Sequence, residues 1–315
     1  MSMQLKNKKF VVIIPVFNES KAILENFQII HRTLQDDGVH AQFFLIDDGS
    51  KDDTWHYIEK IMNLYPEVSA LRFARNFGKE LALMAGVENI DADYYCFMDS
   101  DLQHPPKCIK GMLELMFSER VNIVEGTKAS RGKESLLYRW IAENFYRTLR
   151  WVTKLEMNNS SDFKIMDRQV IDTIRNFHEH RVFFRGIVDW VGFKRASFKF
   201  DVAERVNGKS KFSTSKLAML AVNAIVSYTS KPLYLTVVLG AIFLVFAFIL
   251  GIQTLFNYLV GSAVDGFSTV ILLLLTIGAM LMLSIGMIGV YIARIYDEIK
   301  GRPRYIVAEK KVNTD

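Results

Sequence analysis

Short apolar runs separated by polar, helix-opening segments fill the first two thirds of the chain. Runs rich in β-branched and aromatic residues predict strands at 10–16, 43–46, 68–73 and 94–98. Helical patterns follow at about 21–35, from Asp52–Thr54 to Leu64, and at 79–89. Strand–helix alternation at this spacing predicts an α/β domain with a mainly parallel sheet. Ligands of such sheets bind beyond the carboxyl ends of the strands, so polar residues there are the first candidates for function.

The last third of the chain is almost uncharged. Between Pro232 and Ala293 the only charged residue is Asp265. A helix needs roughly 20 apolar residues to cross a bilayer, so 233–259 and 268–293 predict two transmembrane helices joined by a short turn. Basic residues flank both spans and are absent from the turn, which predicts that both termini are cytoplasmic. A hairpin alone has too few helices for a transport pathway, so the chemistry is expected in the part before it.

These patterns predict four parts. We expect a cytoplasmic catalytic domain over 1–212, an amphipathic juxtamembrane helix over 213–231, two transmembrane helices within 232–293 and a cytoplasmic tail over 294–315. The protein would then be a multi-pass membrane protein.

Composition and charge further limit the kind of protein that this chain can be. Half of the 315 residues are hydrophobic and 23% are charged, which excludes an intrinsically disordered chain. The net charge of +5 is concentrated, because residues 194–231 hold eight Lys or Arg and two acidic residues. This segment indicates contact with anionic lipid headgroups, with phosphate, or with both. The two cysteines, Cys96 and Cys108, make no disulfide framework and indicate a reducing compartment.

Carboxylates follow three of the predicted strands. Glu19 follows the first, Asp47 and Asp48 follow the second, and Asp99 and Asp101 follow the fourth. Two Asp at i, i+2 in an extended turn can direct oxygens toward one hard cation, and Gln103 offers a third oxygen two residues on. Mg²⁺ and Mn²⁺ prefer such ligands and often bridge to substrate phosphates. The role of His104, beside this turn, is open between a site residue and a surface residue.

Four ordered motifs identify the chain as similar to a known family. Residues 12–19 (VIIPVFNE), 46–50 (IDDGS), 75–79 (RNFGK) and 99–104 (DSDLQH) closely resemble family 2 glycosyltransferases. More narrowly, they resemble the polyisoprenyl-phosphate glycosyltransferases, relatives of dolichol-phosphate mannose synthase that often end in a two-helix membrane hairpin. The resemblance implies a GT-A fold, a nucleotide-sugar donor and inverting transfer to a lipid phosphate in a bacterial inner membrane.

The resemblance also implies roles for the donor site. Asp47 or Asp48 would read the uracil or ribose, and Asp101 and Gln103 would hold Mg²⁺ or Mn²⁺ against the diphosphate. Arg205 and Lys211 lie in the segment RVNGKSKF, which resembles the Arg-x-x-Gly-x-Ser-Lys-aromatic segment of the family and would neutralise phosphate. The full set expected around the nucleotide sugar is Pro15, Phe17, Glu19, Asp47, Asp48, Asp99, Ser100, Arg205 and Lys211.

The acceptor site is implied in the same way. Residues 160–168 (SSDFKIMDR) resemble the Asp-Phe-Arg-Leu-Met-Asp-Arg segment of the family, with Lys164 in the place of an Arg. Asp162 is the candidate base or acceptor-orienting carboxylate, and Asp99 is the second catalytic candidate. Lys128, Arg131 and Lys164 would contact the acceptor phosphate. Because a phosphate monoester is largely a dianion at pH 7, positioning and charge screening should matter more than proton abstraction.

The sequence therefore predicts an enzyme that moves glucose or N-acetylglucosamine from a UDP-sugar to undecaprenyl phosphate at the cytoplasmic membrane face. Such transfer would serve cell-envelope glycan modification. Two alternatives stay open: a short membrane polysaccharide synthase, disfavoured because no Gln-x-x-Arg-Trp motif is present, and a catalytically inactive nucleotide-sugar-binding module. Expected partners are the donor, the acceptor and the bilayer, with no nucleic acid. A homo-oligomer, a flippase and a downstream membrane glycosyltransferase are left open as further partners.

Overall fold

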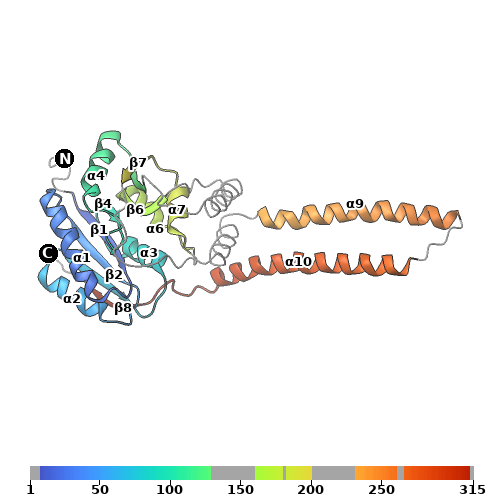
Figure 1. Cartoon of the computed structure of the whole chain (residues 1–315), viewed down its shortest axis with the longest axis horizontal. Helices are drawn as coiled ribbons and strands as arrows, with labels where there is room; N and C mark the ends of the chain where they lie inside the picture. Colours follow the sequence, from blue (N-terminus) through green and yellow to red (C-terminus); the bar gives the residue numbers. More distant parts are fainter. Residues whose placement is uncertain (1–7, 129–159, 180–181, 201–230, 261–265, 313–315) are drawn as a thin grey trace. The chain divides into compact units, whose positions relative to one another are not determined.

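The computed structural model describes residues 8–128, 160–179, 182–200, 231–260 and 266–312 (Figure 1). The chain divides into two compact units, one with the α/β part and one with two long apolar helices. In the first unit the elements before the apolar helices are β1 (Phe10–Val16), α1 (Ser20–Asp36), β2 (Gln42–Asp47), α2 (Thr54–Leu64), β3 (Val68–Phe73), α3 (Lys79–Asn89), β4 (Tyr94–Phe97), α4 (Cys108–Glu119), β5 (Ile123–Lys128), β6 (Ser160–Asp167), α6 (Arg168–Arg175), α7 (Phe184–Trp190) and β7 (Arg195–Phe200). The predicted strands and helices are thus confirmed to within a few residues.

One eight-stranded sheet forms the centre of this unit, with the strand order β7-β5-β6-β4-β1-β2-β3-β8. The central strands β4, β1, β2 and β3 run parallel, as expected, while β6 runs antiparallel to both β4 and β5. Because β6 is antiparallel, its first residues lie at the edge where β4 ends. The carboxyl ends of β1, β2 and β4 and the start of β6 therefore share one edge of the sheet.

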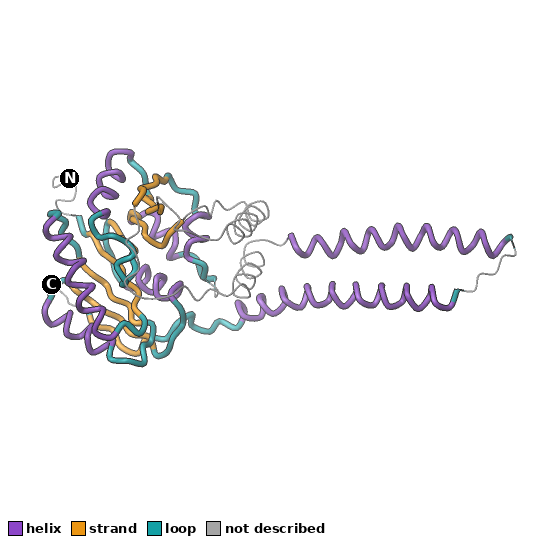
Figure 2. The backbone as a smooth tube through the Cα atoms, in the orientation of Figure 1, coloured by secondary structure: helices purple, strands orange, loops and turns teal. Residues whose placement is uncertain are grey.

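Helices cover both faces of the sheet (Figures 1 and 2). Alternate residues of β1 point to opposite sides, so Val12 and Ile14 pack with α1, α2 and α4, while Val11 and Ile13 pack with α3, α6 and α7. Both groups of side chains are fully buried. This explains why the strands are apolar throughout instead of alternating with polar residues.

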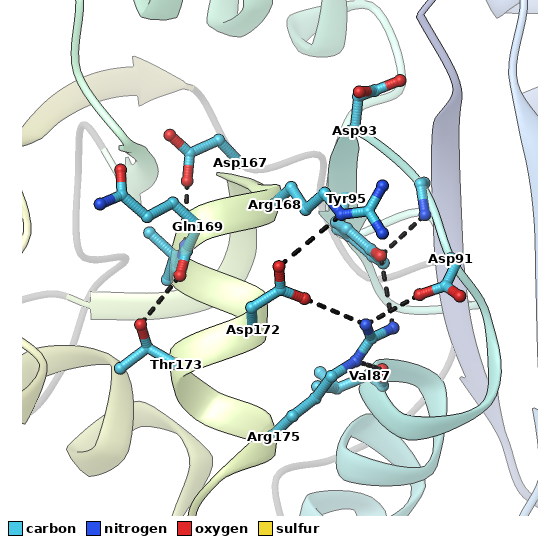
Figure 3. Close-up of polar contacts among 12 residues, drawn as sticks. Val87, Asp91, Asp93, Tyr95, Asp167, Arg168, Gln169, Asp172, Thr173 and Arg175 are labelled. Carbon is cyan, nitrogen blue, oxygen red and sulfur yellow. Dashed lines mark hydrogen bonds and ion pairs between the residues drawn. The ribbon is translucent and has the colours of Figure 1, made fainter.

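Helix α3 is fixed at its C-terminal end by α6 (Figure 3). Arg175 of α6 donates hydrogen bonds to the carbonyl oxygens of Val87 at 2.8 Å and Ile90 at 2.7 Å. Its guanidinium also pairs with Asp91 at 2.8 Å and Asp172 at 3.1 Å. Carbonyl groups at a helix end lack intrahelical donors, so Arg175 satisfies groups that α3 leaves open. This anchoring stabilises the helix whose opposite end, its start, carries site residues.

The C-terminal segment differs from the tail expected at 294–315. Strand β8 (Val307–Lys311) pairs antiparallel with β3 and completes the sheet of the first unit. Just before it, the Tyr305 hydroxyl lies 2.6 Å from Glu88 Oε2, and its ring stacks on Phe73. Arg304 also pairs with Glu88. The short strand is largely exposed at the sheet edge, so it lacks the apolar pattern by which the other strands are predicted.

The second unit contains α9 (Lys231–Leu259) and α10 (Phe267–Ile299). Many of their described apolar side chains are exposed. Within the described residues, one stretch, Thr276–Ile299, is long and apolar enough to cross a membrane, and Thr236–Leu250 is a shorter apolar segment. One span is therefore indicated by length and composition, and the second span stays a prediction. The expected turn at 261–265 and most of the juxtamembrane helix at 213–231 lie outside the described residues.

Candidate active site

A cavity of about 200 Å³ opens at the edge of the sheet where β1, β2 and β4 end. Its lining comprises Pro15, Val16, Phe17, Glu19, Asp48, Lys79, Asp99, Ser100 and Asp101. The structure thus brings together seven positions that the sequence indicates for the donor or the metal, from three separate strand ends. Lys79 was not singled out from the sequence, although it ends the motif 75–79. The sequence did offer a signal for Lys79: it is the first residue of a helix that follows the end of a strand, where ligands of such sheets bind.

The turn after β2 is shaped by Gly49. Its φ of +66° lies in the left-handed region, and a Cβ there would stand 2.3 Å from the backbone carbonyl carbon of Arg75. Only glycine fits this position, because any side chain would overlap the backbone of the 75–79 loop. The next residue, Ser50, accepts the backbone N–H of Asn18 at 2.9 Å. The loops after β1, β2 and β3 are therefore packed against one another.

The two aspartates after β2 have different surroundings. Asp47 is fully buried, accepts the N–H of Ser50 at 2.9 Å and pairs with Arg72 at 3.3 Å. Asp48 lines the cavity, and its oxygens accept the backbone N–H groups of Phe77 at 2.7 Å and Gly78 at 2.9 Å. Burial raises the pKa of both carboxyl groups. Of the two alternatives for reading the nucleoside, only Asp48 reaches the cavity.

His104 supports the turn after β4. Its Nδ1 accepts the backbone N–H of Asp99 at 3.0 Å, and its ring stacks on Phe163 with the centroids 5.0 Å apart. The ring is buried, which lowers the pKa of His104. A neutral imidazole with Nδ1 as acceptor is what this bond requires. His104 is thus not a surface residue, one of the two alternatives that the sequence left open: it is buried and positions the backbone of Asp99.

The carboxylates around this turn concentrate negative charge. Burial raises the pKa of Glu19, and the neighbouring Asp101, Asp52 and Asp99 raise it further. Asp101 is exposed, its Oδ1 accepts the N–H of Gln103 at 3.1 Å, and no cationic side chain of the described residues pairs with it. An exposed carboxylate in an acidic cavity fits a hard cation that takes its other ligands from a diphosphate. Among the described residues, no cluster of three or more His, Cys, Asp or Glu forms a complete metal site.

A chain of ion pairs leads from Asp99 across to β6. The ammonium of Lys79 lies 2.5 Å from Asp99 Oδ1 and 2.7 Å from Asp162 Oδ2. On its other side, Asp162 accepts Nε and Nη2 of Arg185 at 2.5 Å and 2.9 Å, a bidentate arrangement. Burial acts to raise the pKa of Asp162, but the bonds from Arg185 and the charge of Lys79 outweigh it and hold the pKa well below its usual range. Asp162 is therefore an anion whose lone pairs are engaged, which makes it a weak base.

Glu80, the neighbour of Lys79 on α3, fixes the helix that carries Arg185. Its Oε2 accepts the backbone N–H of Phe184, the first residue of α7, at 2.7 Å. Burial raises the pKa of Glu80. Of two consecutive residues of α3, Lys79 thus pairs with Asp162, and Glu80 holds the start of the helix from which Arg185 reaches Asp162.

The comparisons with known proteins bear on what this arrangement does. Residues 11–175 match the family model described as glycosyl transferase family 2. The chain belongs to this family. It is 33% identical to the prophage bactoprenol glucosyl transferase homolog of Escherichia coli (strain K12) over 305 residues, which cover 96% of this chain and 99% of that protein. It is 34% identical to the bactoprenol glucosyl transferase of Shigella phage SfV over 306 residues, with coverage of 96% and 99%.

A solved structure is also similar. Glucosyl-3-phosphoglycerate synthase from Mycobacterium tuberculosis, in complex with Mn²⁺ and uridine-diphosphate-glucose, matches 71% of this chain and 79% of its own. The TM-score is 0.48 and the identity 19%, a level that carries no information on substrate or metal. The GT-A class expected from the sequence is confirmed by the family match together with the sheet described above.

The remaining predicted donor and acceptor residues of this glycosyltransferase lie away from the cavity or outside the described residues. Lys164 on β6 is fully buried and its ammonium pairs with Glu125 on β5. It would have to break that pair to reach a phosphate, so the structure gives Lys164 a structural role in place of the expected phosphate contact. Lys128 is the last residue of β5, and its side chain is outside the description. Arg131, Arg205 and Lys211 lie outside the described residues.

Proposed function

We propose that this family 2 glycosyltransferase moves a sugar from a UDP-sugar to a polyisoprenyl phosphate at the cytoplasmic face of a bacterial inner membrane, with inversion at the anomeric carbon. The observation that carries the proposal is the cavity itself. It joins a nucleoside-sized recess, an exposed carboxylate and a chain of ion pairs along one edge of the sheet.

The donor would occupy the part of the cavity formed by β1 and β2. Phe17 exposes 43% of its surface there and offers an apolar face to a base, while Asp48 and Glu19 offer acceptors for ribose or uracil donors. Ser100 donates its hydroxyl hydrogen to Glu19 Oε1 at 3.3 Å, which orients that carboxyl group. The nucleoside would thus be read by side chains from two strand ends.

The diphosphate would lie near Asp101. We propose that Asp101, with Gln103, holds Mg²⁺ or Mn²⁺ there, since the acidic surroundings favour a divalent cation. Such an ion supplies charge neutralisation for the leaving UDP. Asp99 would orient the donor sugar, and its bond to Lys79 keeps it in place.

Attack on the sugar requires an acceptor placed in line with the departing diphosphate. A phosphate monoester with a second pKa near ~6 is already a dianion at neutral pH, so no strong base is needed. Asp162 would therefore orient groups around the acceptor and take no proton. Its engaged lone pairs and its lowered pKa support this assignment.

The names of the relatives favour glucose as the sugar and a bactoprenol phosphate, a polyisoprenyl phosphate such as undecaprenyl phosphate, as the acceptor. A panel of UDP-glucose, UDP-N-acetylglucosamine and GDP-mannose with undecaprenyl phosphate tests both choices. We expect UDP release and a lipid-linked sugar from one UDP-sugar. A polymeric product would indicate a polysaccharide synthase, and donor binding without release of UDP would indicate an inactive binding module.

The membrane topology is part of the proposal. We propose that both apolar helices span the bilayer, with the catalytic domain and both termini in the cytoplasm and the 261–265 turn outside. The variant Ser262→Cys should then react with an impermeant maleimide in intact cells. The native Cys96 and Cys108 should not react, because they lie in the cytoplasmic domain. Labelling only after the cells are opened would overturn this orientation.

A further inference from the structure

Lys79 and Arg185 lie on either side of Asp162 and each keeps hydrogen-bond donors unused within the described residues. The ammonium of Lys79 has three donors, of which two point to Asp99 and Asp162. The guanidinium of Arg185 has five, of which two engage Asp162. About two fifths of each of these side chains is exposed, whereas Asp162 exposes 5%. The two cationic side chains are therefore partly exposed, whereas the carboxylate between them is buried.

We infer that Lys79 and Arg185 form the binding site for the phosphate of the acceptor, with Asp162 as the buried carboxylate that holds the two cations side by side. This inference rests on the proposed function and names the residues that receive its second substrate. The guanidinium and the ammonium suit a phosphate dianion, because each forms charge-assisted hydrogen bonds with phosphoryl oxygens.

The position along the sheet edge favours the acceptor over the donor diphosphate. From β2 through β1 to β4, the edge carries Asp48, Glu19 and Asp101, which line the cavity proposed for UDP and its cation. Asp162 lies one strand farther, on β6, and Arg185 is outside the cavity lining. Only Lys79 belongs to both regions. An in-line displacement needs the nucleophile across the sugar from the leaving group. With the diphosphate near Asp101, as proposed, the pairing with Asp162 on β6 would put Lys79 and Arg185 on the acceptor side of the sugar.

Lys79 would then have a second task, because its ammonium touches Asp99 on the donor side and Asp162 on the acceptor side. The attacking phosphate oxygen forms the new bond to the anomeric carbon as the bond to the UDP oxygen breaks, and UDP leaves with the electron pair. No proton, oxidant or further reactant is needed. Lys79 and Arg185 would screen the charge of the phosphate while it approaches.

The inference is tested with full-length enzyme in neutral detergent. Arg185→Ala should raise the KM for polyprenyl phosphate about ten- to a hundredfold, while the KM for the UDP-sugar changes less than about twofold. Arg185→Lys keeps the charge without the bidentate geometry and should be intermediate. Arg168→Ala is the matched control and should leave both KM values unchanged, because the ion pair of Arg168 within the described part of the chain is with Asp172 on the surface of α6 (Figure 3).

Binding without turnover provides a second readout. Farnesyl phosphate should bind the parent enzyme more tightly than farnesol, and Arg185→Ala should abolish that difference while UDP still binds. Two results would show that the inference is wrong while the proposed function stands, both with a parent enzyme that transfers sugar normally. One is an unchanged acceptor KM in Arg185→Ala, and the other is a rise in the donor KM of that variant instead. If the parent transfers no sugar to any polyprenyl phosphate but binds farnesyl phosphate through Arg185, the proposed function fails and the phosphate site stands.

Discussion

The carboxylate of Asp48 accepts the backbone N–H of Gly78 at 2.9 Å, and this bond ties the end of β2 to the start of α3. Gly78 has a φ of +102°, and Lys79 follows it as the first residue of the helix. Asp48 is thus in contact with the cavity and also determines where the ammonium of Lys79 lies. The same side chain therefore lines the cavity and holds the start of the helix that carries Lys79.

Replacing Asp48 with Asn should weaken both stability and activity. Both carboxylate oxygens of Asp48 accept hydrogen bonds, Oδ1 from Phe77 and Oδ2 from Gly78 and the Asn76 side chain. The NH₂ group of Asn takes the place of one of these oxygens and leaves a donor without its acceptor, which costs about 1–3 kcal/mol. We expect a lower melting temperature in detergent and a lower kcat/KM. Asp53→Asn is the matched control, since Asp53 is exposed and makes no side-chain capping bond. Equal effects of the two substitutions would contradict the role given to Asp48.

Replacing Asp101 with Asn should remove the carboxylate proposed to hold the cation. We expect a loss of at least about a hundredfold in kcat and loss of Mn²⁺-dependent UDP binding. EDTA should inactivate the parent enzyme, and added Mg²⁺ or Mn²⁺ should restore it. Asp37→Asn, at the C-terminal end of α1 and outside the cavity lining, serves as a control. Full turnover of the parent in EDTA would refute the metal assignment.

The pH dependence should show no ionisation of Asp162 between pH 5 and 9, because its pKa is held far below that window. We expect kcat/KM to fall on the acid side with the second ionisation of the acceptor phosphate, near pH ~6. The stability contributed by the Asp162 carboxylate should be complete above its unfolded pKa of about 3.9 and be lost as the pH falls toward the lower folded value. The measurement compares the pH–rate profile of the parent with that of Asp162→Asn. An acid limb that disappears in the variant would show that Asp162 does act as a base.

Gly49→Ala and Gly38→Ala separate backbone strain from steric overlap. Both glycines have a φ near +70°, but a Cβ at Gly38 meets nothing within 4 Å, whereas at Gly49 it would overlap the backbone of Arg75. Gly38→Ala should cost about 1–2 kcal/mol for the left-handed conformation alone. Gly49→Ala should cost clearly more and should also reduce UDP binding, since the loop that carries Asp48 has to move. Thermal unfolding and UDP titration of both variants measure the difference.

Arg175→Met tests the anchoring of α3 by α6 (Figure 3). The charged hydrogen bonds to the carbonyl oxygens of Val87 and Ile90 are each worth about 1.5–3 kcal/mol, so the melting temperature should fall clearly. Activity per folded molecule should fall little, because no substrate-facing group is removed. Arg168→Met is the control on the same helix, where an exposed pair contributes roughly 0.3–0.5 kcal/mol. Equal melting temperatures for the two variants would contradict the anchoring role.

The amino-acid sequence by itself determined the α/β class, the central strands and helices, and the acidic strand ends. Each of these depends on local pattern: strand and helix periodicity within about ten residues, and polar residues directly after apolar runs. The carboxyl ends of parallel strands lie at the same edge of a sheet, so the sequence alone predicts that Glu19, Asp48, Asp99 and Asp101 lie at one edge, where all four line the cavity. Strand β8 could not be predicted in this way, because an exposed strand at a sheet edge needs no apolar pattern.

Only the tertiary structure decided which charged groups face one another. Lys79, Asp162 and Arg185 come from α3, β6 and α7, and nothing in their spacing shows that one carboxylate lies between two cations. The same holds for Asp47, which turns to Arg72, and for Lys164, which is buried against Glu125. The physical reason is that burial and pairing depend on the packing of elements distant in sequence. Local pattern sets which side chains are present at an edge, and packing sets which of them remain available to a substrate.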